Sequence, residues 1–404
     1  MRFPAALALL AVVACAAPAA EDDSAGDDEA LTSKDAQILD YAFDGELIAS
    51  PNDDAKKAIV SQLFWTVGPL TTLHQANAQV GRVELSNVVE TVADGKKKVT
   101  YRAKLPVAWP KGAHVDATQP LVLPRDVSAA SITAFATRYD RVCGVREDAV
   151  ALEELWYNFD PTLASCHLAD ADVLRIQATT QRDPHVTRTK YPEYDLVWQD
   201  GALDVVSVFN SHDGSGRREE VQKFVDGTKS RLENAVVTEP PATGSFLRDI
   251  TIDGKSHGQR VTIHALEIDS LYESGPDFEQ RYAPLSAKTD LVTYVGHSVL
   301  GKNTRALSKM SIATPGRYQL FFFNSCDSFA YADTTLTDKR STQFLDVMTN
   351  VLPSFVDNES DSLLVVLGAL LDRAHPASYT KLLGGFPHDQ MVVVWGEDDN
   401  RFRP

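Results

Sequence analysis

Two side chains that can do nucleophilic chemistry stand at the ends of apolar runs in this sequence. Cys326 ends the run 318–326, and His297 ends the earlier run 290–297. Such continuous apolar runs are typical of strands that are covered on both faces of a parallel sheet. Reactive groups of open parallel sheets gather at the carboxyl ends of the strands. We therefore expect the thiol and the imidazole to lie side by side, as a nucleophile and its general acid or base.

The elements that must position this pair lie in residues 196–404, where strand and helix patterns alternate. This alternation predicts an α/β fold, a layered sheet whose central strands are covered on both faces. The crossover between the two runs, 299–315, is long enough to join neighbouring parallel strands. The predicted strands are 202–209, 246–252, 260–268, 291–295, 320–323 and 391–395, the predicted helices are 217–232, 278–285, 341–352 and 379–383, and 363–371 fits either a helix or a strand.

Residues 36–195 are predicted to form a separate N-terminal α+β domain. The turn dipeptide Asp94-Gly95 indicates a hairpin, and the lysine run 96–98 beside it indicates a solvated edge. No recognisable catalytic constellation occurs in this part of the sequence. The predicted elements are helices over 53–64 and 128–139 and strands over 83–92 and 99–109.

Length and charge limit the classes of protein that fit. A chain of 404 residues can form two domains with full hydrophobic cores. The formal net charge of −17 argues against binding nucleic acid, or an anionic membrane surface, through charge.

At the N-terminus, Arg2 precedes an apolar stretch that is too short to span a bilayer, and the small Ala14 precedes Cys15. Residues 1–14 thereby resemble a bacterial lipoprotein signal peptide. The resemblance implies that Cys15 carries a lipid that anchors the exported chain to the membrane. The alternative is an ordinary secretory signal that is cut after a nearby alanine. Because Ala16 is not the aspartate of an inner-membrane retention signal, the outer membrane of a bacterial cell envelope is the expected location.

The segment after the signal peptide is predicted to be a flexible tether. Residues 21–35 are acidic and almost free of apolar side chains, so they cannot bury enough surface to become ordered. We therefore expect 15–35 to consist of the lipidated cysteine and a disordered acidic tether.

The other cysteines fit an exported protein. Cys143 and Cys166 lie in one segment, and a disulfide between them is plausible in an oxidising compartment. That pairing leaves Cys326 as a single thiol. The alternative to a catalytic role is that Cys326 is a small buried hydrophobic residue.

The two strand-end blocks resemble those of the caspase–gingipain superfamily (clan CD) of cysteine peptidases, in which a histidine block and a cysteine block follow neighbouring parallel strands in that order. The matching segments are 291–297 and 320–326. The resemblance implies a caspase-like, mostly parallel sheet with helices on both faces, with His297 as the catalytic imidazole and Cys326 as the nucleophile. The main-chain N–H groups of Ser298 and Cys326 would be the oxyanion donors, and no metal or organic cofactor is required. Ser298 stands where that superfamily usually has glycine after the histidine, a residue that permits backbone dihedral angles that serine disfavours.

Several other motifs have competing interpretations. The stretch 296–303 nearly matches the phosphate-binding pattern GxxxxGK[ST], but Asn303 stands where the pattern needs a hydroxyl group for Mg²⁺. Asp327 is a candidate pocket residue or a helix cap. His212 and Asp213 are candidate pocket residues or part of a plain turn. The scattered histidines indicate no metal site.

The sequence thus predicts a membrane-anchored, exported lipoprotein with cysteine-peptidase activity on a peptide or protein substrate. The alternative is a surface binding or scaffold lipoprotein that keeps the caspase-like fold without the activity. A sealed, apolar environment around Cys326 would favour the alternative, because burial raises the pKa of a thiol and makes it inert.

Overall fold

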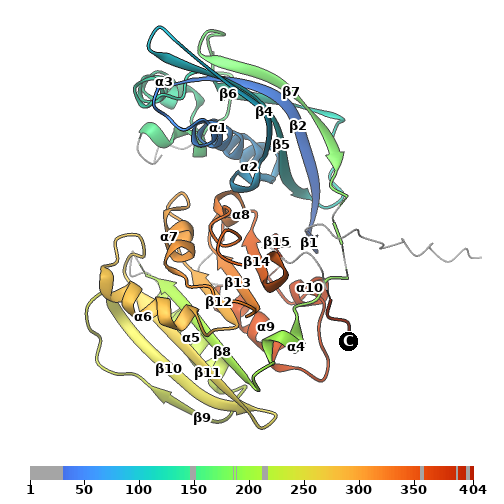
Figure 1. Cartoon of the computed structure of the whole chain (residues 1–404), viewed down its shortest axis with the longest axis vertical. Coiled ribbons are helices and arrows are strands. Elements are labelled where there is room, and N and C mark those ends of the chain that lie inside the picture. The colour runs from blue at the N-terminus through green and yellow to red at the C-terminus, as the bar shows by residue number, and fades with distance from the viewer. Residues whose placement is uncertain are drawn as a thin grey trace, which may run out of the picture.

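The computed structural model describes residues 31–145, 152–184, 186–187, 189–211, 217–354, 359–387, 390–396 and 401–404. In this part of the chain the strands form two sheets, one of six strands and one of nine. Figure 1 shows the smaller sheet with its helices above the larger one. Cys15, His212 and Asp213 lie outside the described residues.

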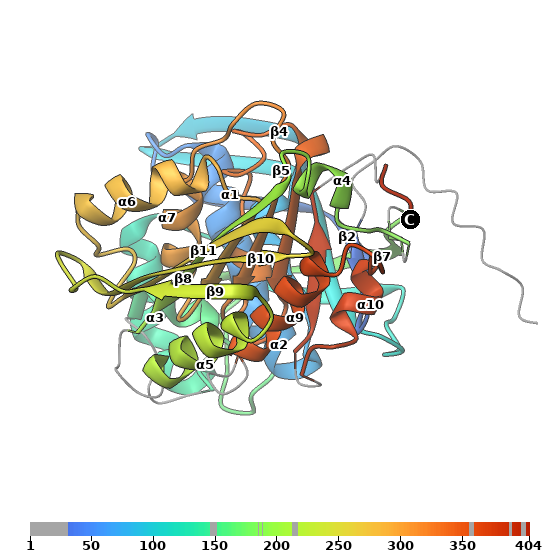
Figure 2. The same ribbon diagram turned by 90° about the horizontal axis from the view of Figure 1, so that it is seen from below.

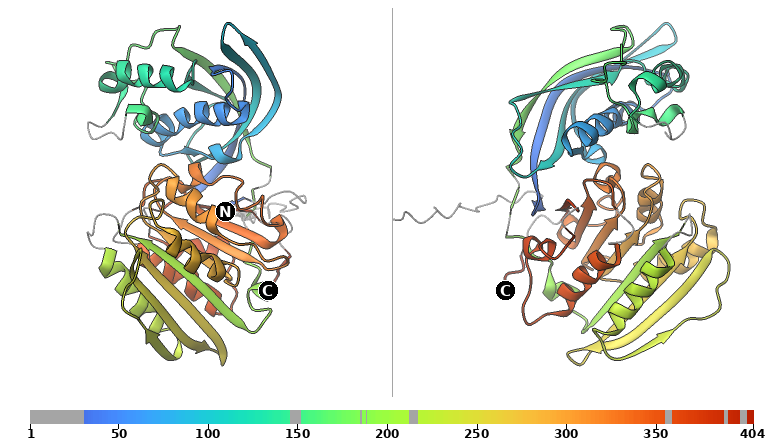
Figure 3. Two further views of the ribbon diagram at one scale, coloured as in Figure 1. Left: turned by 60° about the vertical axis from the view of Figure 1, so that its left-hand side comes forward. Right: turned by 180° about the vertical axis from the view of Figure 1, so that it is seen from behind.

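The smaller sheet is antiparallel and curls around the helices of the first domain (Figure 3). Its strand order is β3-β5-β2-β7-β6, and β4 pairs with β5. Ile59, Trp65 and Phe135 fill the space between the helices and the strands. The elements are β2 (Ala36–Ala49), α1 (Ala55–Leu63), η1 (Phe64–Thr66), α2 (Val67–His74), β3 (Asn77–Ala78), η2 (Val80–Arg82), β4 (Glu84–Ala93), β5 (Lys96–Pro110), β6 (Thr118–Pro124), α3 (Ala129–Cys143), η3 (Leu152–Tyr157) and β7 (Val173–Arg182).

The larger sheet is mixed and has the order β1-β15-β14-β13-β12-β8-β11-β10-β9. Its five central strands, from β14 to β11, are parallel, and the outer strands pair antiparallel. The strands are β1 (Thr32–Ser33), β8 (Ala202–Asn210), β9 (Glu233–Thr238), β10 (Phe246–Ser256), β11 (Gln259–Ile268), β12 (Leu291–Val295), β13 (Gln319–Asn324), β14 (Leu345–Asn350) and β15 (Val392–Trp395). The helices are α4 (Tyr194–Val197), α5 (Arg217–Lys229), α6 (Pro276–Ser286), α7 (Lys302–Met310), α8 (Ser328–Tyr331), η4 (Thr342–Phe344), α9 (Glu359–Leu371) and α10 (Tyr379–Leu383).

Successive side chains of the central strands enter two different cores. In β13, Leu320 and Phe322 belong to the core that includes α5 and α9, whereas Phe321 and Phe323 belong to the core that includes α6 and α7. Figure 2 shows these two pairs of helices on opposite sides of the sheet. Because side chains alternate along a strand, a sheet covered on both faces needs apolar residues at every position. The predicted α/β class is confirmed at this level.

One predicted helix is wrong. Residues 341–352 form the short η4 turn and then the parallel strand β14. The apolar residues of this segment are spaced as on a helix face, but they sit between β13 and β15, where backbone pairing takes precedence over the pattern. Asp346 is buried inside the sheet but has polar partners: the ammonium group of Lys190 lies 2.7 Å from its carboxyl group, and the hydroxyls of Tyr318 and Tyr379 each donate to it at 2.6 Å.

Most of the other predicted elements are present, with shifted ends. The Asp94-Gly95 hairpin joins β4 and β5, and the ambiguous segment 363–371 belongs to the helix α9. The lysine run is not wholly solvated: Lys97 is largely buried, and its ammonium group lies 2.7 Å from a carboxylate oxygen of Glu90.

At the junction of the two domains, chain segments from one side join the sheet or the core of the other. Residues 31–33, which the sequence places in the tether, are buried, and β1 pairs with β15 of the larger sheet. The helix α8, although it follows β13, contributes Ala330 and Tyr331 to the core of the first domain. A Cβ atom on Gly81 would lie 2.4 Å from the carbonyl oxygen of Ala332, so only glycine lets the two backbones approach this closely.

Cys143 and Cys166 form the predicted disulfide, which joins the end of α3 to the segment before β7. Their sequence separation is 23 residues. Cross-linking a loop of this size restricts the unfolded chain and stabilises the folded one by about 3 kcal/mol.

We expect replacement of both cysteines, Cys143→Ala with Cys166→Ala, to lower the free energy of unfolding of the first domain by about 3 kcal/mol, because the unfolded chain regains the entropy of an open loop. Urea unfolding followed by tryptophan fluorescence measures the change. Cys326→Ala is the matched control for loss of a thiol outside the loop. An unfolding free energy equal to that of the unmodified protein would contradict the entropic role of the bridge.

Candidate functional site

The parallel pairing of β12 with β13 brings His297 and Cys326 to the same edge of the larger sheet. Val295 is the register partner of Asn324. His297 and Cys326 each stand two residues beyond these partners, so the two chain segments leave the sheet at the same level. Both residues are half-buried. The predicted juxtaposition of the two strand ends is therefore present.

The backbone of His297 is fixed by contacts from its own loop. The hydroxyl of Tyr294 and the side-chain amide of Asn303 each donate to the carbonyl oxygen of His297 at 2.7 Å. Asn303 in turn accepts from the backbone N–H of Tyr272 at 2.9 Å. Gly296 has a φ of 146°, and a Cβ atom there would lie 2.7 Å from that of Asn210, so this turn requires glycine.

The loop from His297 to α7 is strained. Val299, Leu300 and Gly301 have consecutive φ values of 46°, 51° and 82°. A β-branched residue such as Val299 rarely adopts the left-handed region, and each such residue costs roughly 1–3 kcal/mol. Strain of this kind is concentrated at functional loops, which agrees with a role for this turn in shaping the site.

The contacts of this loop also bear on whether the stretch 296–303 could bind phosphate. Lys302 lies 3.7 Å from a carboxylate oxygen of Glu154 and stands over the ring of Tyr272. Asn303 is fully buried and braces the loop as described above. The residues that would hold phosphate and Mg²⁺ in that pattern therefore have structural partners instead.

The thiol of Cys326 is protonated at neutral pH in this conformation. Its Sγ lies 3.7 Å from the carbonyl oxygen of Ser354, at hydrogen-bonding distance for a sulfur donor. Burial, followed by the negative charges of Asp327 and Glu359, raises the pKa of Cys326 from 9.0 to about 11. A thiol in this state is a poor nucleophile.

Asp327 does not line an open pocket, nor does it cap a helix with its side chain. It is fully buried, in the left-handed conformation with a φ of 52°, and makes no capping hydrogen bond to α8. Its carboxyl group instead accepts from the side-chain amide of Asn77 and from the hydroxyl of Tyr157, each at 2.9 Å. Both donors belong to the first domain, and nothing local in the sequence connects them to this site.

A buried ion pair lies close to the His297 turn. Arg217, at the start of α5, approaches Glu359, at the start of α9, at 2.9 Å, and both are almost fully buried. A Cβ atom on Gly296 would stand 3.2 Å from a guanidinium nitrogen of Arg217. The sequence analysis missed this pair, because only the folded sheet brings the starts of the two helices together.

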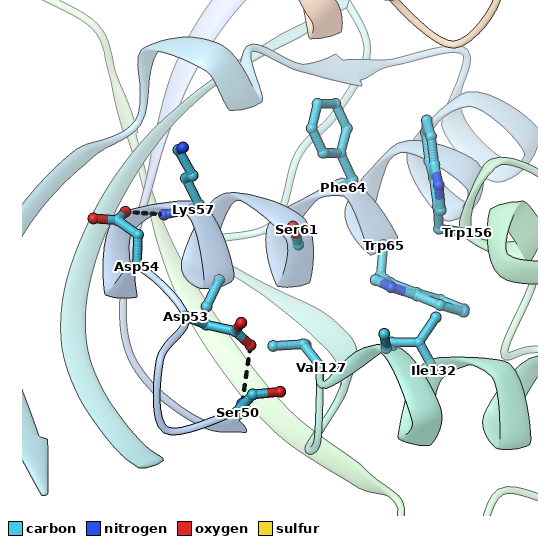
Figure 4. A pocket seen from close by; sticks show the side chains of 12 residues that line it. Ser50, Asp53, Asp54, Lys57, Ser61, Phe64, Trp65, Val127, Ile132 and Trp156 are labelled. Carbon is cyan, nitrogen blue, oxygen red and sulfur yellow. Dashed lines mark hydrogen bonds between the residues drawn. The ribbon is translucent and has the colours of Figure 1, made fainter. Parts of the chain in front are cut away.

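A cavity of about 460 Å³ lies within the first domain, apart from these residues. Figure 4 shows Phe64, Trp65 and Trp156 at one end of it and Asp53 with Asp54 toward the other. Both carboxylates accept backbone N–H groups locally, from Ser50 and from Lys57. Among the described residues, no group of histidine, cysteine, aspartate and glutamate side chains could hold a metal ion.

The comparisons with known proteins add no functional argument. No protein-family model matches the chain, and the search of curated proteins finds no match. Among solved structures, the G domain of the T. maritima FeoB iron transporter is matched with 15% sequence identity, over 43% of this chain and 99% of that domain. Its TM-score of 0.23 is too low to carry a conclusion about fold or activity.

We expect alkylation of Cys326 by iodoacetamide to be slow at neutral pH and to keep accelerating above the ordinary thiol pKa of 9.0, because burial and the neighbouring charges raise the pKa of this group to about 11. Only the thiolate reacts, so the rate follows its fraction. Peptide-level mass spectrometry at each pH measures the rate, and the urea-unfolded protein is the control for an ordinary thiol. A rate that already levels off below about pH 7 would contradict a protonated resting thiol.

Proposed function

We propose that the protein is an exported, lipid-anchored cysteine peptidase with a caspase-like second domain, in which Cys326 is the nucleophile and His297 the general acid and base. The register of β12 and β13 carries this proposal, because it delivers an imidazole and a thiol to one sheet edge from neighbouring parallel strands. The chain order, histidine strand before cysteine strand, is the order that the resemblance to the caspase–gingipain superfamily implies.

The proposed reaction begins with transfer of the thiol proton from Cys326 to His297. The sulfur then attacks the carbonyl carbon of the scissile peptide bond, and His297 returns the proton to the leaving amine. This step forms a thioester to Cys326 and releases the first product. Water, deprotonated by His297, hydrolyses the thioester and regenerates the thiol. The N–H groups of Ser298 and Cys326 are the proposed donors to the oxyanion in both steps.

A second function is favoured by one observation, the raised pKa of Cys326. A thiol that stays protonated cannot attack a peptide, and a protein with such a thiol would serve as a surface binding or scaffold lipoprotein. The two proposals make different demands on the thiol. A peptidase needs a conformation of the same chain in which the pKa of Cys326 is lower, whereas a binding protein does not.

The anchor is proposed at Cys15, with the chain between this residue and Leu31 as the tether. Leu31 is buried against the folded domains. None of the helices in the described ranges combines the length and the hydrophobicity that a membrane span requires. A lipid at Cys15 would hold the folded domains at the membrane surface.

We expect His297→Ala to reduce peptide cleavage by about 10²–10⁴-fold, since that is the usual contribution of a general acid or base, and Cys326→Ala to abolish it. Cleavage of a diverse peptide pool, with sites determined by mass spectrometry, measures both effects. His375→Ala, at an exposed histidine paired with Asp372, is the matched control and should retain full activity. Absence of cleavage by the unmodified protein at every pH, together with a Cys326 that reacts only after denaturation, would favour the binding protein.

We expect Cys15→Ser to release the protein from the membrane fraction of a bacterial expression host, because the residue that carries the lipid is lost. Metabolic labelling with a fatty acid, followed by fractionation, measures both lipid and location. Ala16→Asp is the matched variant, which should keep the lipid and move the protein to the inner membrane. Incorporation of label into Cys15→Ser would contradict this anchor.

A further inference from the structure

We propose that Asn77 and Tyr157 of the first domain are positioning residues that clamp the Cys326 loop in a closed, unreactive conformation. The first domain would then control the thiol of the second. This inference rests on the proposed function in taking Cys326 as the nucleophile.

The clamp consists of two hydrogen bonds onto the residue that follows the thiol. Asn77, in β3, donates its side-chain amide to one carboxyl oxygen of Asp327, and the hydroxyl of Tyr157, in η3, donates to the other. Each bond is 2.9 Å long, and Asp327 has no solvent exposure. Both acceptor oxygens of the buried carboxyl group are thus bound to donors of the other domain.

Asn77 also joins two loops of the sheet edge. The same amide group donates to the carbonyl oxygen of Val351 at 2.9 Å, just beyond β14. The oxygen of the Asn77 side chain accepts from the backbone N–H of Ala78 at 2.9 Å. The amide therefore has defined partners on both of its ends and holds the loop after β13 against the loop after β14.

The backbone of the Cys326 loop depends on this arrangement. Asp327 is held in the left-handed region, which a non-glycine residue adopts at a cost unless its surroundings require it. The helix α8 follows at once, and Tyr331 is packed with Phe64 and Trp156 of the first domain. The chain on the C-terminal side of the thiol is therefore held from two sides: by the first domain, and by its own sheet through the hydroxyl of Ser328, which donates to the carbonyl oxygen of Phe323 and accepts from the backbone N–H of Asn350.

The clamp determines what the thiol faces. The groups that interact electrostatically with Cys326 are Asp327 on its own loop, Glu359 on α9, Tyr294 on β12 and Tyr331 on α8. Burial is the main cause of the raised pKa of Cys326, and the charge of Asp327 is the next. Both causes weaken if the loop is released and Asp327 turns toward solvent.

The test is the pH profile of Cys326 alkylation in purified Asn77→Ala and Tyr157→Phe variants. We expect the midpoint of the profile to fall from about 11 toward the ordinary 9.0. A fall of one pH unit corresponds to about a tenfold faster reaction at pH 7. Tyr157→Phe removes a single oxygen atom, so it carries the test alone if Asn77→Ala does not fold.

Two variants serve as matched controls. Tyr139→Phe removes a hydroxyl group that bonds Asp172 inside the first domain. Arg82→Lys changes a different contact across the junction, where the guanidinium stands 4.6 Å from the ring centre of Trp395. Neither substitution touches Asp327, so both should leave the midpoint unchanged while thermal unfolding reports any loss of stability.

An unchanged midpoint in folded Tyr157→Phe, or an equal shift in Tyr139→Phe, would overturn the clamp. A fast reaction of the unmodified protein at neutral pH would also overturn it, while leaving the proposed peptidase in place. A lowered midpoint without any peptide cleavage would support the clamp and count against the peptidase.

Discussion

The register between β12 and β13 is the constraint on which the candidate site depends. Parallel strands have no turn to fix their alignment, so the pairing of Val295 with Asn324 rests on the apolar side chains that both faces of the sheet must bury. A shift of this register by one residue would move Phe321 and Phe323 to the other face of the sheet, and so into the opposite core. It would also move Cys326 away from the level of His297. Core packing thus brings the backbones of His297 and Cys326 to one level of the sheet edge.

The first domain contacts the residues that follow β13, beyond the end of the larger sheet. A strand end fixes the direction in which the chain leaves the sheet, but the next residues are free unless something holds them. Here α8 is embedded in the core of the first domain, and Gly81 lets the two backbones touch. The groups around Cys326 belong to its own domain, and the first domain acts on them through Asp327 and α8. An isolated second domain would lack Asn77 and Tyr157, and with them the two hydrogen bonds that the carboxyl group of Asp327 accepts.

The sequence predicted those features that leave a local pattern of residue types along the chain. The apolar runs before His297 and Cys326 identified β12 and β13, and the expectation of an oxidising compartment led to the disulfide. The same reasoning misassigned β14, because the apolar spacing of that strand matches a helix face and its place between β13 and β15 is a tertiary property. The ion pair of Arg217 with Glu359 could not be predicted either, since the two residues meet only when α5 and α9 pack together. Buried charges carry no local signal when their partners are distant in the chain.

The cause of the raised thiol pKa bears on whether Cys326 is inert or latent. A change from 9.0 to about 11 corresponds to about 3 kcal/mol in favour of the protonated form. Around Cys326 part of this energy comes from the charges of Asp327 and Glu359 and from a loop that the other domain holds in place. Loss of a few hydrogen bonds, each worth about 1 kcal/mol, is enough to change such an environment. The charges beside the buried thiol are what would distinguish the proposed switch from a cysteine that merely fills space.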